Sequence, residues 1–283
     1  MKFGASTWLW TSPFTSDNIA LLENIAALGF NFVELPVENP GDINPDQLKP
    51  VLQQLGLDVV ICAAVTGERD LSSANPEIRR NALDYFTRCV KLAEALGSDC
   101  FAGPFYAQVG KPRLPTASLR QAEWDNAVNG LAALAKVAGD SGVRLGLEPL
   151  NRFETDMVNN VSDALRLIED TGSPQLGISL DSFHMNIEET NFRAAIEQAG
   201  KRLVHLQVSD SHRGVPGDGN SDWAGLRAGL KAIGYDGRIS IESFSPDASS
   251  LADAVCIWRP FTKTQDEFAS RGLAFLQQWW AEA

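Results

Sequence analysis

Four polar side chains fall at or near the ends of four consecutive strand-like segments in the second half of the sequence. They are Glu148, Asp181, Gln207 and Glu242. Three carboxylates that converge on one place repel one another unless protons or a cation compensate their charge. An oxygen-rich ligand set suits Mn²⁺ or Mg²⁺ better than Zn²⁺, with Co²⁺ as a further candidate. We therefore expect the four side chains to hold a divalent metal, and Glu148 and Glu242 to be available as an acid/base pair.

The three histidines and one arginine lie in the same half of the chain. His184 follows Asp181 closely, so we expect it in a loop over the site, in contact with a substrate. His205 precedes Gln207 by two residues and is expected deeper, as a hydrogen-bonded core histidine. Of His212 and Arg213, one is expected at the surface. Arg213 is the better candidate for binding an oxygen-rich ligand, because its guanidinium is a fixed positive fork.

Aromatic residues follow two of the strand-like segments, Trp8 and Trp10 after the first and Phe105 and Tyr106 after the fourth. They either pack a loop or provide an apolar wall against the apolar face of a substrate. We take Trp8 and Phe105 as candidate substrate contacts. Glu34, near the end of the second segment, is a weaker candidate for orienting a substrate hydroxyl.

These residues must be positioned by a regular framework, and short strand-like runs alternate with helical patterns along the whole chain. The strand-like runs are 2–8, 30–37, 58–65, 99–105, 143–150, 176–185, 202–210 and 238–244. The amphipathic helical segments are 17–28, 45–55, 76–96, 117–138, 161–170, 192–199, 222–233 and 265–281. Several of these helices precede a glycine, which is typical of a helix C-terminus.

Eight strand–helix units in 283 residues, without an evident linker, predict a single (β/α)8 TIM barrel of residues 1–283. A doubly wound sheet is the alternative, but no glycine-rich phosphate loop follows the first strand. In a barrel, chemistry is found at the C-terminal ends of the strands, which is where the four polar side chains stand.

Composition excludes several classes of protein. The formal net charge of −12 disfavours a nucleic-acid partner, which would need a basic surface. No apolar run reaches the roughly 18 residues of a membrane helix, and no signal peptide is evident, so we expect a cytoplasmic protein without membrane contact. The four cysteines match no zinc-ligand spacing and are expected to be reduced and mostly buried.

Five spaced segments resemble the D-tagatose 3-epimerase and D-psicose (allulose) 3-epimerase group of the xylose isomerase-like sugar isomerase/epimerase barrels. They are GLEPLNRFE (146–154), LDSFHMNIEE (180–189), SDSHRGVPGDG (209–219), IESF (241–244) and IWRP (257–260). The resemblance implies that Glu148, Asp181 and Glu242 bind a divalent metal and that the two glutamates act on opposite faces of the sugar. It also implies that Glu154, His184 and Arg213 contact the substrate.

One position departs from this group. The fourth metal ligand of the epimerases is a histidine, and the matching residue here is Gln207. A glutamine carbonyl is also a neutral ligand, and it gives an all-oxygen set that favours Mg²⁺ or Mn²⁺. Glutamine at this place resembles the hydroxypyruvate isomerases of the same superfamily. His212 also stands where the epimerases often carry Asn.

The leading hypothesis is therefore a metal-dependent epimerase that inverts C3 of a free ketose of the D-tagatose, D-psicose, D-fructose or L-ribulose type, through a metal-bound enediolate. The alternatives are an aldose–ketose or hydroxypyruvate-type isomerase, and a lyase or dehydratase acting on a keto-sugar or keto-glycoside. More distant alternatives are a zinc nuclease of the endonuclease IV type, which the few histidines disfavour, and a non-catalytic sugar-binding protein. The resemblance also implies a homodimer or homotetramer.

Overall fold

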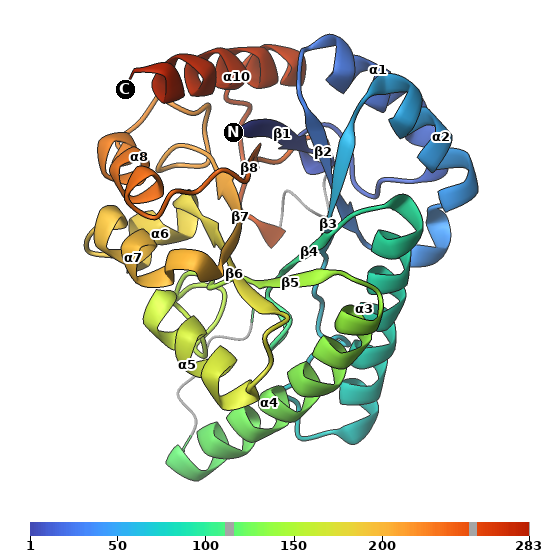
Figure 1. Ribbon diagram of the computed structural model, residues 1–283, viewed down its shortest axis with the longest axis vertical. Helices are drawn as coiled ribbons and strands as arrows, with labels where there is room; N and C mark the ends of the chain where they lie inside the picture. Colours follow the sequence, from blue (N-terminus) through green and yellow to red (C-terminus); the bar gives the residue numbers. More distant parts are fainter. Residues whose placement is uncertain (111–115, 249–253, 283) are drawn as a thin grey trace.

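Eight parallel strands, joined in chain order, close into a barrel with helices around it (Figure 1). The computed structural model describes residues 1–110, 116–248 and 254–282. The strands are β1 (Lys2–Ser6), β2 (Phe32–Val37), β3 (Asp58–Ala63), β4 (Cys100–Gly103), β5 (Arg144–Leu147), β6 (Leu176–Asp181), β7 (Leu203–Val208) and β8 (Arg238–Ile241). Because β8 also pairs with β1, the sheet has no free edge. The predicted TIM barrel is confirmed.

The helices follow the strands and form the outer ring in Figure 1. They are α1 (Ile19–Ala27), α2 (Pro45–Leu55), α3 (Pro76–Leu96), α4 (Ala117–Asp140), α5 (Val161–Thr171), α6 (Ser182–Glu188), α7 (Phe192–Ala199), α8 (Trp223–Ala232) and α10 (Gln265–Ala281). Local sequence explains many of their ends. For example, the Asn75 side chain accepts a hydrogen bond from the amide of Glu77 at the start of α3, and Gly97 ends that helix with φ of 82°.

Two differences from the expected elements concern the site. The segment after Asp181 is a short helix, α6, rather than a loop, and Asp181 caps it by accepting a hydrogen bond from the Phe183 amide at 2.9 Å. In addition, β5 and β8 end earlier than expected, so Glu148 and Glu242 are the first residues beyond their strands. Pro149 has no amide hydrogen and cannot continue a ladder, which accounts for the early end of β5.

Buried apolar side chains of the described residues form three clusters, and one of them consists of Phe244 and Ile257. The larger core lies between the barrel and its helices. A smaller cluster of Phe32, Val60 and Cys100, with Val204 packed against it, belongs to the strands themselves. Simple alternation along the strand-like run 202–210 predicts that Val204, like Leu206 and Val208, faces the helices, and for Val204 this is wrong. The register of the β6–β7 pair shifts between Ile178 and Ser179, so Val204 lies against Gly177 of β6 and Gly146 of β5 instead.

Two expectations from composition can be compared with the structure. Within the described ranges, no helix has both the length and the apolar character needed to cross a membrane. All four cysteines are free, and Cys62, Cys89 and Cys100 are buried while Cys256 is exposed. The expectation that they are mostly buried is confirmed.

Candidate active site

The structure brings the four expected polar side chains together at the C-terminal end of the barrel. Asp181 ends β6 and pairs in register with Gln207 of β7, while Glu148 and Glu242 follow β5 and β8. Each of the four is at most 5% exposed. Gln207 donates a hydrogen bond from Nε2 to Glu242 Oε1 at 3.0 Å. The parallel strands therefore place these four side chains in one buried region.

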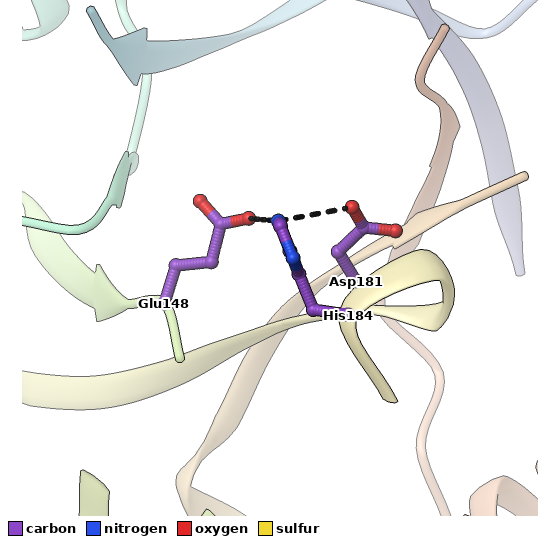
Figure 2. A group of neighbouring side chains, drawn as sticks. All are labelled: Glu148, Asp181 and His184. Atoms are coloured by element: carbon purple, nitrogen blue, oxygen red, sulfur yellow. Dashed lines mark ion pairs between the residues drawn. The ribbon is translucent and has the colours of Figure 1, made fainter. Parts of the chain in front are cut away.

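Glu148, Asp181 and His184 form a compact group that a single cation could contact (Figure 2). One ligand atom from each lies within 4.8 Å of the others. His184 Nε2 stands between the two carboxylates, 3.7 Å from Glu148 Oε1 and 3.6 Å from Asp181 Oδ2. The helix α6 positions His184, because its ring projects from the first turn after Asp181.

The hydrogen bonds of His184 determine which ring nitrogen carries the proton. The backbone amide of Asn151 donates to Nδ1 at 3.1 Å, so Nδ1 must offer a lone pair. Burial lowers the pKa of His184, which keeps the ring neutral. Two Asn151 contacts at Nδ1, at 3.1 and 2.8 Å, are shorter than the 3.4 Å contact of Arg213 Nη2 with Nε2, so we assign the single proton to Nε2. A histidine that ligates a metal usually donates from its other nitrogen, which is the opposite pattern. His184 is therefore arranged to donate a hydrogen bond toward the site.

Beneath the carboxylates lies a fully buried polar layer. Glu34 Oε1 accepts a hydrogen bond from Gln207 Nε2 at 2.9 Å, and Glu34 Oε2 accepts one from Ser240 Oγ at 2.6 Å and lies 2.6 Å from His205 Nε2. The expectation that His205 is a hydrogen-bonded core histidine is confirmed. Glu34 was considered for orienting a substrate hydroxyl, but it does not line the cavity and contacts Gln207 instead.

Glu34 and Glu242 together determine the orientation of the Gln207 amide. Both carboxylates accept from its nitrogen, so Nε2 faces them and Oε1 is turned elsewhere. This Oε1 atom is buried and has no hydrogen-bond partner among the residues that the structure describes. A buried acceptor without a partner among the described residues is compatible with a bound cation, and oxygen donors fit Mg²⁺ or Mn²⁺. The compact group contains Glu148 and Asp181, and the ligand roles of Gln207 and Glu242 stay predictions.

Arg213 enters the same cluster from the loop after β7. Its Nη2 lies 2.6 Å from Asp181 Oδ2 and 3.1 Å from Glu242 Oε2, and its guanidinium carbon is 4.2 Å from the ring centre of Phe183 and 4.7 Å from that of Phe244. Burial alone would lower the pKa of Arg213, but the two carboxylates outweigh it and raise the pKa. His212 is exposed and Arg213 is buried, which confirms that one of the two neighbours lies at the surface, while ligand binding by Arg213 stays a prediction.

Asp210 holds the loop that carries Arg213. Its carboxylate accepts from the amides of Ser211 at 2.8 Å, Gly217 at 2.9 Å and Ser221 at 3.1 Å, and from Trp223 Nε1 at 3.0 Å. Arg213 has a φ of 65°, which is uncommon for a residue with a side chain. The loop must therefore hold Arg213 in a conformation that it would not adopt freely.

We expect Asp210→Ala to lower kcat/KM about tenfold to a hundredfold, because four hydrogen bonds to a charged group are lost and Arg213 is no longer held in place. Steady-state kinetics and thermal unfolding measure the effect. Asp218→Asn is the matched control, because Asp218 lies in the same loop but makes only a half-exposed ion pair with Arg271. Equal kinetics for the two variants would show that Asp210 does not position Arg213.

Glu148 and Glu242 are both buried carboxylates with altered acidity. Burial raises the pKa of Glu148 well above its ordinary value, and the negative charges of Glu242 and Asp181 raise it further. Burial also raises the pKa of Glu242, although Arg213 opposes the shift. In the metal-free protein, these carboxyl groups therefore favour the protonated form more than ordinary glutamates do.

This shift predicts a pH dependence of the stability of the metal-free protein. A carboxyl group with a raised pKa in the folded state stabilises the fold below its unfolded pKa, and this contribution is lost as pH rises through the folded pKa, at about 1.4 kcal/mol per pKa unit. His184, whose pKa is lowered, acts in the opposite direction. We therefore expect the unfolding free energy of Glu148→Gln, relative to that of the unchanged chain, to increase between pH 5 and pH 8. Urea unfolding in the presence of a chelator measures this difference in unfolding free energy. A difference that stays constant between pH 5 and pH 8 would contradict the raised pKa of Glu148.

A cavity of about 300 Å³ opens above these groups. Its polar lining includes Glu148, Glu154, His184, Arg213 and Glu242. Trp8 also lines the cavity, as expected for a substrate contact. Phe105 does not. It is fully buried and packs on Phe86 and Phe101, with ring centres 5.4 and 4.7 Å away, so the expectation that it forms a wall of the site was wrong.

Sequence reasoning missed two residues, one beside the cavity and one in its lining. Asn151 is 2% exposed and connects two residues of the cavity lining, because its Nδ2 lies 2.8 Å from both Glu154 Oε1 and His184 Nδ1. It stands in the segment GLEPLNRFE, whose resemblance to the epimerases implied roles for Glu148 and Glu154 but not for Asn151. Glu38, directly after β2, also lines the cavity. No strand-parity pattern marks it, because it lies beyond the last paired residue of β2.

The sequence of the chain matches a known family of barrel proteins. Residues 22–278 match the family model described as "Xylose isomerase-like TIM barrel", and the chain belongs to this family. Among curated proteins, it is 32% identical over 278 residues to the L-ribulose 3-epimerase of Mesorhizobium japonicum, covering 97% of this chain and 93% of that protein. It is 30% identical to the D-psicose 3-epimerase of Ruminiclostridium cellulolyticum, covering 94% and 92%. Both relatives are sugar epimerases, and the similarity covers more than nine tenths of each.

A solved structure agrees with this placement. The D-allulose 3-epimerase from Methylomonas sp. in complex with D-allulose superposes with a TM-score of 0.92 at 28% identity, covering 98% of this chain and 96% of that one. The resemblance inferred from the five sequence segments is therefore confirmed at the level of the family.

Proposed function

We propose that this chain is a divalent-metal-dependent epimerase that inverts C3 of a free ketose. The observation that carries the proposal is the pair of buried carboxylates, Glu148 and Glu242, which face one cavity from β5 and β8. Inversion needs a group on each face of the carbon, one to remove a proton and one to supply it. The names of the relatives, ketose and L-ribulose 3-epimerases among them, favour the same reaction.

The acidity of the two glutamates suits this role. A group that must accept a proton in one direction and donate it in the other works best with a pKa near the working pH. In the metal-free protein, burial and the negative charge of Asp181 raise the pKa values of both Glu148 and Glu242 above that of an ordinary glutamate. One glutamate removes the C3 proton, and the other delivers a proton to the opposite face. Which glutamate acts first depends on the epimer that is bound.

The remaining site residues would bind and orient the sugar. Glu148, Asp181, Gln207 and Glu242 would hold the metal, which when bound supplies positive charge next to the substrate oxygens that become negative. Nε2–H of His184 and the guanidinium of Arg213 are donors for the same oxygens. Glu154, held by Asn151 at 2.8 Å, is an acceptor for a substrate hydroxyl.

Product analysis tests this function. The purified chain, supplied with Mn²⁺ or Mg²⁺, is incubated in D₂O with D-tagatose, D-psicose, D-fructose and L-ribulose, and the products are followed by NMR. We expect the C3 epimer of at least one ketose, with solvent deuterium at C3. Formation of an aldose or loss of water, without a C3 epimer, would contradict the proposal.

Gln207 supports one alternative, an aldose–ketose or hydroxypyruvate-type isomerase. Its unpaired Oε1 makes the metal-ligand set all-oxygen, unlike the histidine-containing set of the epimerases that the sequence resembles. An isomerase needs no second group on the opposite face, so only one of the two glutamates would be essential. Hydroxypyruvate and the matching aldoses belong in the same NMR panel for this reason.

A further inference from the structure

The outer part of the cavity contains a carboxylate that the proposed reaction does not use. Glu38 is the first residue beyond β2 and lines the same cavity as the catalytic glutamates. Trp8, Thr66 and Phe244 line the cavity with it, and the rings of Trp8 and Phe244 lie 5.6 Å apart. Apolar rings beside a single acidic group form a surface that suits one end of a sugar.

Glu38 is held in place from three directions. Its Oε1 accepts a hydrogen bond from Trp8 Nε1 at 2.8 Å and another from Ser12 Oγ at 2.7 Å. Its backbone oxygen accepts from Arg69 Nη2 at 2.5 Å. The carboxylate is therefore fixed by its neighbours and is not a mobile surface side chain.

The second oxygen of this carboxylate is left without a partner. Glu38 Oε2 is buried, and the described part of the chain offers it no hydrogen bond. Arg69 contacts the main-chain oxygen of Glu38 rather than its carboxylate. A buried carboxylate oxygen without a donor is costly, and its position in a cavity suggests that a ligand supplies the donor.

The position of Glu38 along the barrel indicates which part of a ligand it meets. Glu34 contacts Ser240, so these two residues lie at one level of the barrel. Glu242 is two residues beyond Ser240, whereas Glu38 is four residues beyond Glu34. At about 3.3 Å per strand residue, Glu38 lies roughly two residues further toward the mouth than Glu242. It would meet the end of the sugar remote from the reacting carbon.

We propose that Glu38 determines specificity by accepting a hydrogen bond from the terminal hydroxyl of the ketose. This inference rests on the proposed function and deepens it. A neutral hydroxyl satisfies Oε2, a deoxy end leaves it unpaired, and a phosphate or carboxylate at that end is repelled by the uncompensated charge. The substrate class is then a ketose with a free terminal hydroxyl, neither phosphorylated nor oxidised at that end.

The test compares D-allulose with 6-deoxy-D-allulose and D-allulose 6-phosphate, and L-ribulose with 5-deoxy-L-ribulose, using the metal-loaded enzyme. We expect the unchanged chain to prefer the hydroxylated ketose over its deoxy analogue by about tenfold to a hundredfold in kcat/KM. Glu38→Gln can keep the contacts of Trp8 and Ser12 through its own Oε1, but it places a donor where Oε2 stood. This variant is expected to lose most of the preference, to retain its rate on the deoxy analogue, and to reject the phosphate less strongly.

Two further measurements make the outcome decisive. Glu23→Gln, an exposed carboxylate on α1, is the control and is expected to keep the preference of the unchanged chain. The rate on the deoxy analogue and the thermal midpoint report whether Glu38→Gln is folded. An unchanged chain that turns over both analogues equally, or a Glu38→Gln variant with an unaltered preference, would overturn the role of Glu38. If the unchanged chain epimerises no ketose, the proposed function itself fails, and this inference falls with it.

Discussion

Glu148→Gln and Glu242→Gln are each expected to lower the rate of C3 epimerisation by about 10²–10⁴-fold. Each change keeps the shape of the side chain but removes its ability to accept and return a proton. The two residues directly follow β5 and β8, so neither can take over the position of the other. Steady-state turnover, measured with a coupled or chromatographic assay, gives the size of the loss.

Isotope exchange distinguishes the roles of the two glutamates more clearly than the overall epimerisation rate does. Each variant retains one of the two groups, so it can still remove and return a proton on one face of C3. We expect each variant to exchange the C3 hydrogen of one epimer with D₂O without inverting it, and the two variants to act on opposite epimers. For an isomerase with one base, we would instead expect one variant to show no exchange or turnover and the other to keep nearly the full rate.

The control must exclude loss of the metal, since both glutamates are expected ligands. Metal content after dialysis is therefore measured for each variant, and rates are compared at saturating Mn²⁺. Glu94→Gln, which removes an exposed surface ion pair with Lys91, should leave turnover unchanged. Near-normal epimerisation by either metal-loaded active-site variant would refute the two-base arrangement.

Removal of the metal is expected to abolish turnover, with a fall of about 10³-fold or more, because charge stabilisation by a bound cation contributes several kcal/mol to such reactions. Activity should return with Mn²⁺ or Mg²⁺, and with Co²⁺ to a degree that measures the preference of the site. Binding also has a readout that is independent of activity. Metal at a hundred times its Kd should raise the unfolding free energy by about 2.7 kcal/mol.

Gln207 makes the metal prediction specific to this chain. Gln207→His introduces an imidazole ligand, so we expect the relative affinity for Co²⁺ over Mg²⁺ to rise, as measured by calorimetric titration. Gln207→Leu removes the ligand oxygen and should weaken every metal. Asp181→Asn should also weaken binding, because it loses a negative ligand. Full activity in the chelated protein, with less than stoichiometric metal, would show that the cluster is not a metal centre.

Several features of the fold and site were accessible from the sequence because they depend on local patterns. Strand parity placed Glu148, Asp181, Gln207 and Glu242 on strands of one parallel barrel, and parallel strands end on the same side. The bounds of α2, α3, α7 and α10 agreed with the structure, since their caps and apolar periodicity are local signals. Local patterns failed at Val204, where a shift of register that no local signal marks turned the side chain into the barrel.

Phe105, Asn151 and Glu38 show what the sequence did not reveal. Phe105 and Trp8 both follow a strand, yet only Trp8 lines the cavity, because the direction of a side chain beyond a strand depends on what packs around it. The roles of Asn151 and Glu38 arise from hydrogen bonds to residues far along the chain.

The sequence by itself determined the barrel and the set of carboxylates that meet at its mouth, because periodicity of side chains and the common direction of parallel strands need no further information. The tertiary structure determined the protonation and the orientation of those groups. It directed the Asn151 amide at His184 Nδ1, turned the Gln207 amide by means of Glu34, and gave one oxygen of Glu38 no donor among the described residues. Each of these depends on contacts between distant strands and loops, which determine hydrogen-bond direction and burial.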